Sequence, residues 1–446
     1  MNKLFCIIIV FSFLSICLAD QVTIYNDNFS LVRTSLELDL EKGVQNVFID
    51  DIPSTIESSS VIIKPQNGKI EIFSQNYEYD LANTNQILRK YIGKEVEVIS
   101  VTDQVFAGIL QFNDYQTIGI LDSVTNKLTL LNYKEVRNIN LAELPANFFL
   151  KPTLNWKLKS EKSGKHNIDF SYLCYGMMWE VTYNCVWNAE SEKLDINSWV
   201  TITNETGKAF QNTKLKLIAG DVNKIPQYRG GRTNEVVYAV DGMKTKSPQF
   251  DEKAFHDFHL YTLSENVNIN NNQTKQLRLF PIKTVQAEQT YEYKTYSNEV
   301  RGIIKFQNSK KNGLGLPLPK GELKLYQKDE ADDQLEFIGE DRIDHTPKDE
   351  EVKIQTGNAF DLIAETKVTD SRKITKNVSE KDIVVFLKNR SNKDKEIIIS
   401  HNLSGNWTIE KENVSYKKED AFNVKFIKIL KTGEEAEVTW TERIEY

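Results

Sequence analysis

A regular alternation of large apolar side chains near the middle of the chain is the feature that most constrains its fold. Apolar and aromatic residues recur at every second position in residues 168–174 and again in residues 179–187. This period places one set of side chains on one face of a β-sheet, and aromatic and β-branched residues suit a half-buried strand. Gly176, between the two runs, can supply the positive φ of a tight turn. Together with further runs at 194–202 and 215–217, the pattern predicts an antiparallel meander.

Short strand patterns fill most of the remaining chain as well. Residues 22–79 and the chain from Lys151 onward consist of short apolar runs separated by Gly, Asn, Asp and Pro. The Asn67-Gly68 pair between two such runs is a strong hairpin signal. Because many short strands with frequent turns are typical of sandwiches and barrels, the sequence predicts an all-β fold built from antiparallel β-sandwich modules.

Residues 83–145 have the pattern of a separate insert. A short helical segment, Thr84–Tyr91, ends near Gly93 and is followed by strand-length runs that close with Val136–Ile139. This order resembles an SH3-like or Sm-like small barrel. Such an insert either binds a peptide, cell-wall material or RNA, or is structural and binds nothing. The sequence thus predicts an N-terminal β region, the inserted small barrel, a central antiparallel sheet domain and a C-terminal β-sandwich, at residues 20–82, 83–145, 146–310 and 311–446.

The first 19 residues have the features of a secretory signal peptide. Lys3 precedes an apolar run, and small residues precede Asp20. The run is shorter than the roughly 20 residues that a membrane span needs. Ile16 before Cys17 argues against lipid attachment there. We therefore expect an exported protein, periplasmic or secreted and associated with the cell envelope, with no transmembrane segment in the mature chain.

The net charge of the chain limits the classes of molecule that it is expected to bind. The full chain has a formal charge of −7, and removal of the signal peptide takes away one lysine and no acid. Nucleic acid and anionic membranes are recognised through basic surfaces, so an acidic chain disfavours both. An envelope protein or a polysaccharide remains as the expected class of partner.

Two cysteines remain after processing, and an exported protein with two cysteines suggests a disulfide. If residues 168–187 form a hairpin that turns at Gly176, Cys174 and Cys185 lie about 20 Å apart along the strands. A disulfide requires Cα atoms within about 7 Å. The sequence therefore predicts two buried free thiols.

Several motifs also resemble one family of exported proteins. They are Tyr172, Gly176, Trp179 and Tyr183, then Trp199-Val200, Asn204–Gly207, Ala219–Asn223, Phe258–Leu263, and parts of residues 339–347 and 357–361. In this order they resemble the proteins named for domain of unknown function 4139, the mucoidy-inhibitor-A-like proteins. The resemblance covers nearly the whole mature chain. It implies a fold and an export route, and it brings no agreed activity or catalytic residues.

Motifs of common enzymes are absent from the sequence. The chain has no Gly-rich phosphate loop, no HExxH, no CxxC and no Gly-x-Ser-x-Gly elbow. His256 and His259, with Asp251 and Asp257 nearby, form the only cluster that resembles a metal site. On a strand the two histidines point to opposite faces, whereas zinc needs three or four converging ligands. We therefore predict no catalytic, cofactor-binding or metal residues and no cofactor.

Other polar and aromatic residues have structural interpretations that we favour over functional ones. His345, beside Asp344 in a turn, is expected to lock a loop by a hydrogen bond, and Arg229 and Arg232 to lie in a solvated loop. Aromatic residues at strand spacing are expected to be core, although they could line a carbohydrate cleft. These aromatic residues are Tyr172, Trp179, Tyr183, Trp187 and Trp199.

Two hypotheses about function follow from these observations. The first, which we favour, is a non-enzymatic exported β-protein that binds or scaffolds a component of the cell envelope. The second is a hydrolase or metal-dependent enzyme that uses His256, His259 and nearby acids. A pocket where those side chains converge would favour the enzyme, and a filled sheet face would favour the scaffold. The fold class alone cannot decide, because sandwiches serve both functions.

Overall fold

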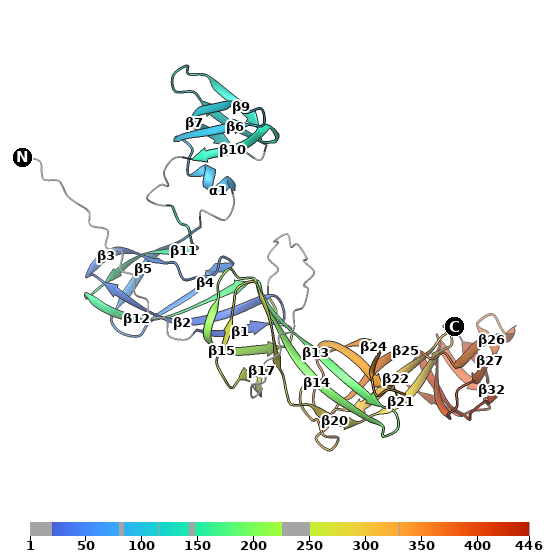
Figure 1. Ribbon diagram of the computed structural model, residues 1–446. Coiled ribbons are helices and arrows are strands. Elements are labelled where there is room, and N and C mark those ends of the chain that lie inside the picture. Colours follow the sequence, from blue (N-terminus) through green and yellow to red (C-terminus); the bar gives the residue numbers. More distant parts are fainter. Residues whose placement is uncertain are drawn as a thin grey trace, which may run out of the picture. The chain divides into compact units, whose positions relative to one another are not determined.

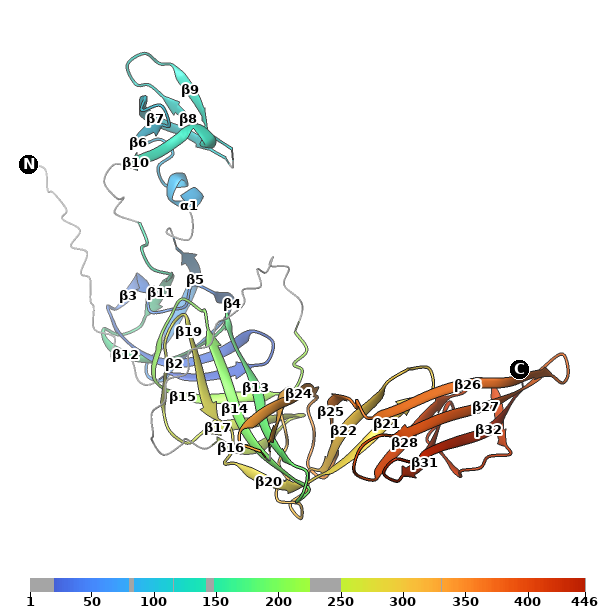
Figure 2. The ribbon, with the colours of Figure 1, turned by 45° about the vertical axis from the view of Figure 1, so that its right-hand side comes forward.

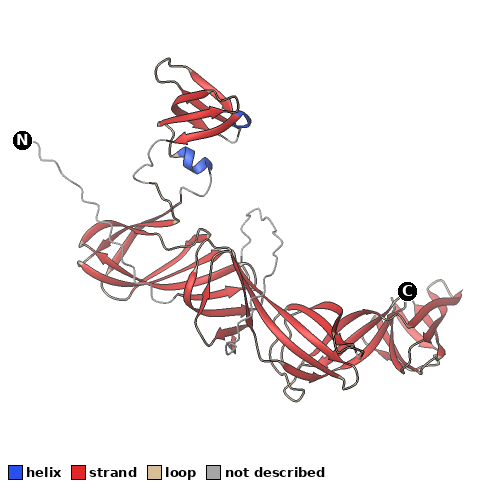
Figure 3. Cartoon of the chain, in the orientation of Figure 1, coloured by secondary structure: helices blue, strands red, loops and turns tan. Residues whose placement is uncertain are grey.

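The computed structural model describes residues 20–79, 84–114, 116–141, 148–224, 250–329 and 331–445. The predicted signal peptide, with Cys17, lies outside these residues, as do Arg229 and Arg232. Strands dominate the described chain, and α1 (Thr84–Arg89) is its one α-helix (Figure 3). The predicted all-β fold is confirmed. Within the described ranges no helix has the length and apolar character needed to cross a membrane.

The chain divides into two compact units. The first contains residues 1–178, 203–216 and 266–274, and the second contains the rest. The chain passes from one unit to the other within the strands β13 (Met177–Asn188), β14 (Lys193–Asn204), β15 (Phe210–Ala219) and β19 (Gln273–Arg278).

One large sheet and one small sheet build most of the first unit (Figure 1). Within the first unit the strands of the large sheet are ordered β15-β1-β2-β12-β4, and β18 pairs with β15. In the small sheet, β11 lies between β3 and β5. The new strands are β1 (Gln21–Tyr25), β2 (Phe29–Leu40), β3 (Gly43–Ile49), β4 (Ile56–Pro65), β5 (Ile70–Glu78), β11 (Thr153–Ser160), β12 (Gly164–Tyr175) and β18 (Val267–Ile269).

The predicted meander is correct only where β13 pairs with β14, and its other pairings are wrong. β12 pairs with β2 and β4, whereas β13, the next strand, pairs with β14 and β23 in another sheet. Gly176 joins β12 to β13 with a φ of 84°, and a Cβ there would lie 2.9 Å from the carbonyl oxygen of Glu205. The glycine is therefore needed for a close backbone approach where the chain changes sheets, and it does not close a hairpin.

The predicted hairpin at Asn67-Gly68 is wrong for the same reason. Gly68 has the expected positive φ of 74°, yet β4 pairs with β12 and β5 pairs with β11. The Asn67 side chain accepts a hydrogen bond from the backbone N–H of Asn167 at 2.7 Å. This contact ties the turn to the start of β12, so the turn directs the two flanking strands into different sheets.

The insert contains the five predicted strands in a single antiparallel sheet, ordered β10-β6-β7-β8-β9. They are β6 (Glu95–Ser100), β7 (Val105–Asn113), β8 (Thr117–Leu121), β9 (Leu128–Asn132) and β10 (Val136–Leu141). The expected closure into a barrel is wrong, because β9 and β10 do not pair. A 3₁₀ turn at Tyr133–Glu135 separates them and directs β10 along β6 instead. Leu88 and Tyr91, at α1 and just after it, pack into the apolar core of this sheet.

The second unit contains a mixed sheet and a hairpin. In the sheet the order is β19-β14-β13-β23-β24, with β20 paired to β14, and β16 and β17 form the hairpin. β13 and β23 run parallel, whereas the sequence predicted antiparallel sheets throughout. A parallel pair needs a long connection between its strands, and here more than 130 residues separate the end of β13 from the start of β23. The new strands are β16 (Phe250–Phe255), β17 (Phe258–Leu263), β20 (Lys283–Gln286), β23 (Gly321–Lys328) and β24 (Leu335–Ile343).

A two-layer sandwich forms the C-terminal part of the second unit (Figure 2). One layer is ordered β25-β22-β21-β28-β31-β30 and the other β26-β27-β32-β29, and both contribute to one apolar core. The strands are β21 (Glu288–Lys294), β22 (Val300–Gln307), β25 (Glu351–Asn358), β26 (Leu362–Lys373), β27 (Val378–Asn389), β28 (Lys395–Asn402), β29 (Asn406–Glu410), β30 (Tyr416–Lys418), β31 (Asn423–Leu430) and β32 (Glu435–Glu445). The sandwich thus begins with β21, upstream of residue 311.

A buried asparagine closes the turn after β14. The Asn204 side-chain amide is fully buried and lies within 3.4 Å of the carbonyl oxygens of Lys208, Ile269 and Asn270. Its Oδ1 accepts hydrogen bonds from the backbone N–H and the hydroxyl of Thr206. Because buried polar groups need partners, this one side chain satisfies several backbone groups at once. The motif Asn204–Gly207 therefore has a structural role.

The same turn recurs after β27 in the C-terminal sandwich. The fully buried Asn389 amide lies within 3.2 Å of the carbonyl oxygens of Lys393, Leu430 and Lys431. Its Oδ1 accepts from the backbone N–H and the hydroxyl of Ser391. In both turns, Asn is followed by Thr or Ser at the second position and by Lys at the fourth. The same local arrangement of hydrogen bonds therefore stabilises a turn in two different sheets of the chain.

Candidate functional site

The histidine pair that could have formed a metal site lies on the β16–β17 hairpin. His256 occupies the turn with a φ of 56°, and its side chain is 73% exposed, lies 2.9 Å from the Asp257 carboxylate and stacks on the Phe258 ring. His259 is on β17, where its Nδ1 lies 2.7 Å from Oε1 of Glu252 on β16. The two imidazoles therefore have separate partners. In the described ranges, no group of three or more His, Cys, Asp or Glu side chains could hold a metal ion.

His345 locks a loop, as predicted from the sequence. The backbone N–H of Lys320 donates to its Nδ1 at 3.1 Å, and the Lys320 ammonium donates to Asp221 at 3.0 Å. Burial lowers the pKa of His345, and the charge of Lys320 lowers it further, so the imidazole is neutral. Backbone bonds between Leu318 and Thr346 close the same loop. These residues hold the entry to β23 in place.

Most of the aromatic set is core. Tyr172, Trp179, Tyr183 and Trp187 are each at most 2% exposed, so they line no open cleft. Tyr172 lies in β12 and the other three lie in β13, so they do not share one face. The prediction that Trp199 belongs to the core is wrong. This residue is half-buried on the outer face of β14, beside Arg278. Side chains alternate between the two faces of a strand, so residue 199 points to the face opposite that of the inward residues, which are 194, 196, 198, 200 and 202.

Both cysteines are buried and free, as predicted. The reason differs from the predicted one, because Cys174 lies in β12 and Cys185 in β13, which belong to different sheets. The Cys174 Sγ lies 3.1 Å from the Ser30 hydroxyl. Burial raises the pKa of the Cys185 thiol, which makes it a poor nucleophile.

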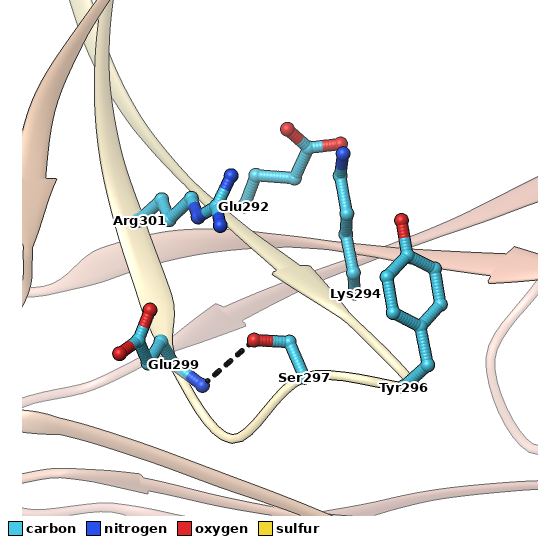
Figure 4. Close-up of a pocket in the computed structure, with 6 residues that line it drawn as sticks. All are labelled: Glu292, Lys294, Tyr296, Ser297, Glu299 and Arg301. Carbon is cyan, nitrogen blue, oxygen red and sulfur yellow. Dashed lines mark hydrogen bonds between the residues drawn. The ribbon is translucent and has the colours of Figure 1, made fainter.

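A hollow of about 300 Å³ lies on the β21–β22 hairpin (Figure 4). Glu292 and Arg301 are directly paired across the two strands. Lys294 follows Glu292 at the second position of β21, and Tyr296 lies in the turn just after the strand. The three side chains rise on one side, as Figure 4 shows. Ser297 and Glu299 complete the lining from the turn, where the backbone N–H of Glu299 donates to the Ser297 hydroxyl at 3.1 Å.

The hollow has balanced charge and an exposed aromatic ring. Two carboxylates, of Glu292 and Glu299, accompany the ammonium of Lys294 and the guanidinium of Arg301, and no ion pair joins these four described residues. The Glu292 carboxylate accepts a hydrogen bond from the Ser400 hydroxyl on β28 at 2.9 Å. The Tyr296 ring is 75% exposed. Such a surface presents hydrogen-bond donors, acceptors and a flat apolar platform within one small space.

Sequence reasoning missed this hollow. The run Tyr291-Glu-Tyr-Lys-Thr-Tyr296 alternates, but its last aromatic residue departs from the pattern. Tyr291 and Tyr293 are buried, and Tyr296 comes three positions later, on the opposite face. That change of face was the available signal. Arg301 and Ser400 could not have been added, because their nearness depends on the pairing of β21 with β22 and β28.

A buried ionic network links the two layers of the C-terminal sandwich. His401 Nε2 lies 2.9 Å from the Glu442 carboxylate, and His401 Nδ1 lies 2.7 Å from the Thr295 hydroxyl. Lys381 approaches the other oxygen of Glu442 at 3.2 Å. Burial raises the pKa of Glu442, but the hydrogen bond and charge of His401 and the contact with Lys381 outweigh it. The pKa therefore lies below its ordinary value of 4.5.

We expect this network to make the sandwich sensitive to acid. A carboxyl group whose pKa is depressed by folding stabilises the native state above its unfolded pKa, and this stability is lost as the pH falls through the folded pKa. The wild type should therefore lose stability below about pH 4.5. Glu442→Gln should be less stable at neutral pH and should lack this part of the pH dependence. Urea midpoints followed by tryptophan fluorescence test this, and parallel pH profiles for the two proteins would contradict it.

No family model matches this chain, and no curated protein matches it.

Proposed function

We propose that the chain is an exported, non-enzymatic β-protein that binds or scaffolds another component at the cell envelope. The hollow on the β21–β22 hairpin carries this proposal, because it combines charged groups that are not paired with one another and an aromatic ring open to solvent. Exposed aromatic rings beside fixed polar groups are typical of binding surfaces. The signal-peptide pattern of residues 1–19 supports export.

A hydrolase is the second candidate function. One observation favours it, which is the hydrogen bond between His259 and Glu252, since a carboxylate that orients a histidine is a feature of general-base catalysis. No nucleophile is hydrogen-bonded to His259 among the described residues, and His256 points away into the turn. We therefore favour binding over catalysis.

Incubation of the mature chain with isolated cell envelopes separates these two functions. We expect the protein to sediment with the envelopes in a saturable manner and to release no soluble product, and His259→Gln to behave as the wild type does. Phe360→Ala, at a side chain that is 97% exposed, serves as the control for nonspecific effects of substitution. Product release that His259→Gln abolishes would support the hydrolase and contradict our proposal.

A further inference from the structure

We propose that the hollow on the β21–β22 hairpin is a subsite for a neutral saccharide. This inference rests on the proposed binding function and names the class of ligand that the hollow would take. Small-molecule pockets have volumes of about 300–1,000 Å³. The hollow, at about 300 Å³, is at the lower end of that range. It suits a small ligand or one unit of a longer chain.

The charges of the hollow favour hydroxyl groups over a charged ligand. Glu292 and Glu299 can only accept hydrogen bonds, whereas Lys294 and Arg301 can only donate them. A hydroxyl group does both, so a ring with adjacent hydroxyls can bridge an acid and a base that do not contact each other. The four formal charges cancel, and a site with no net charge does not attract a polyanion.

Tyr296 provides the platform that a sugar ring needs. Its ring is 75% exposed at the rim of the hollow. Tyrosine offers a large, rigid and amphipathic contact area with few rotatable bonds, so little entropy is lost when a ligand packs against it. The apolar C–H face of a saccharide can lie on the ring while its hydroxyls meet the charged groups beside it.

The surrounding sheet holds these groups before any ligand arrives. β21 lies between β22 and β28 inside its layer, so Glu292 and Lys294 project from a central strand, whereas Tyr296, Ser297 and Glu299 lie in the turn that follows it. Ser400 on β28 fixes the Glu292 carboxylate, and the Ser297 hydroxyl fixes the backbone at Glu299. Glu292, Lys294 and Arg301 lie on packed strands, and groups on packed strands are held more firmly than groups on loops, which lowers the entropy cost of binding.

A protein partner fits this hollow less well. A stable protein interface buries about 800 Å² on each partner and has an apolar centre depleted of charge. The hollow has a single aromatic ring and four charged side chains. We therefore assign the ligand to the saccharides, and the experiment below includes the result that would point to a protein instead.

Titration of the mature chain, residues 20–446, with oligosaccharides of one length tests the inference. Cellohexaose, chitohexaose and maltohexaose are neutral probes, and a galacturonate hexamer and a chitosan hexamer are the anionic and cationic comparisons. We expect calorimetry or ligand-observed NMR to detect at least one neutral hexamer, and to detect the charged hexamers less well or not at all. Tyr296→Ala should weaken that binding at least about tenfold, because the stacked contact is lost.

Conservative variants separate a binding role from a folding defect. Tyr296→Phe keeps the ring and should bind almost as the wild type does, and Arg301→Gln should weaken binding by removing a charged donor. Phe360→Ala should have no effect. Binding of no neutral hexamer, preference for a charged one, or equal binding by Tyr296→Ala would overturn the inference. If envelope capture then persisted, a protein partner would be indicated and only the saccharide assignment would fail. Loss of envelope capture as well would refute the proposed function.

Discussion

Replacement of Trp179 by alanine is expected to lower the free energy of unfolding of the second unit by about 3–5 kcal/mol. Trp179 is 1% exposed, its ring lies 6.3 Å from that of Tyr261, and its Nε1 donates to the carbonyl oxygen of Ile218 at 3.3 Å. Truncation removes buried apolar surface, leaves a cavity and deprives that carbonyl of a donor. Since domains are stable by about 5–15 kcal/mol, the variant should melt far below the wild type or fail to fold.

Trp199→Ala is the matched control for this prediction. It removes the same side chain from the outer face of β14, where the ring is half-buried and the Arg278 guanidinium lies 5.6 Å from its centre. We expect a loss of about 1 kcal/mol there. Calorimetric melting of both variants, with Glu180→Ala as a surface reference, makes the comparison. An unchanged melting temperature for Trp179→Ala would contradict the assignment of this side chain to the core.

Replacement of Asn389 by alanine is expected to destabilise the C-terminal sandwich by about 3 kcal/mol. The carbonyl oxygens of Lys393, Leu430 and Lys431 would lose the amide donor, and the backbone N–H of Ser391 would lose its acceptor. Buried polar groups without partners pay their full desolvation cost, which explains the size of the effect. Urea unfolding of the mature chain, followed by tryptophan fluorescence, measures it.

Two further variants sharpen this prediction. Asn389→Asp keeps the acceptor oxygen but loses the amide donor, so it should be nearly as unstable as the alanine variant. Asn204→Ala should cause a similar loss in the sheet that contains β14, because the hydrogen bonds are the same in kind. If either alanine variant unfolded at the wild-type urea concentration, the turns would not depend on the buried amide.

Local alternation predicted which segments are strands but not which strands pair. Residues 168–174 and 179–187 are strands with the expected inward side chains, and the core aromatic residues follow from them. β13 does pair with the next strand, β14, but the other partners lie far away in sequence, because β12 pairs with β2 and β4 and β13 pairs with β23. Glycine supplies the same positive φ in a hairpin and in a crossing between sheets, so Gly68 and Gly176 could not distinguish the two.

The candidate site was predictable only where it depended on local contacts. The loop-locking role of His345 needed only a neighbouring turn, and the sequence predicted it. The strand segments of the insert also followed from the sequence, whereas its failure to close depends on how the 3₁₀ turn at Tyr133–Glu135 directs β10. The lining of the hollow comes from one hairpin, but the position of Arg301 opposite Glu292 depends on the register of β21 and β22, and Ser400 reaches Glu292 from the distant strand β28, so the local sequence pattern could not define it.

Crosslinking of the native protein in intact cells, followed by its purification from the envelope fraction, tests the central claim most directly. A photoreactive group placed at Tyr296 reports on the hollow, and the same group at Phe360 reports on an exposed position elsewhere. We predict envelope material attached at Tyr296 in excess of that at Phe360, and competition by the neutral hexamer that binds the purified chain. Equal labelling at the two positions, or recovery of the protein with nothing attached, would contradict an envelope-binding role for this chain.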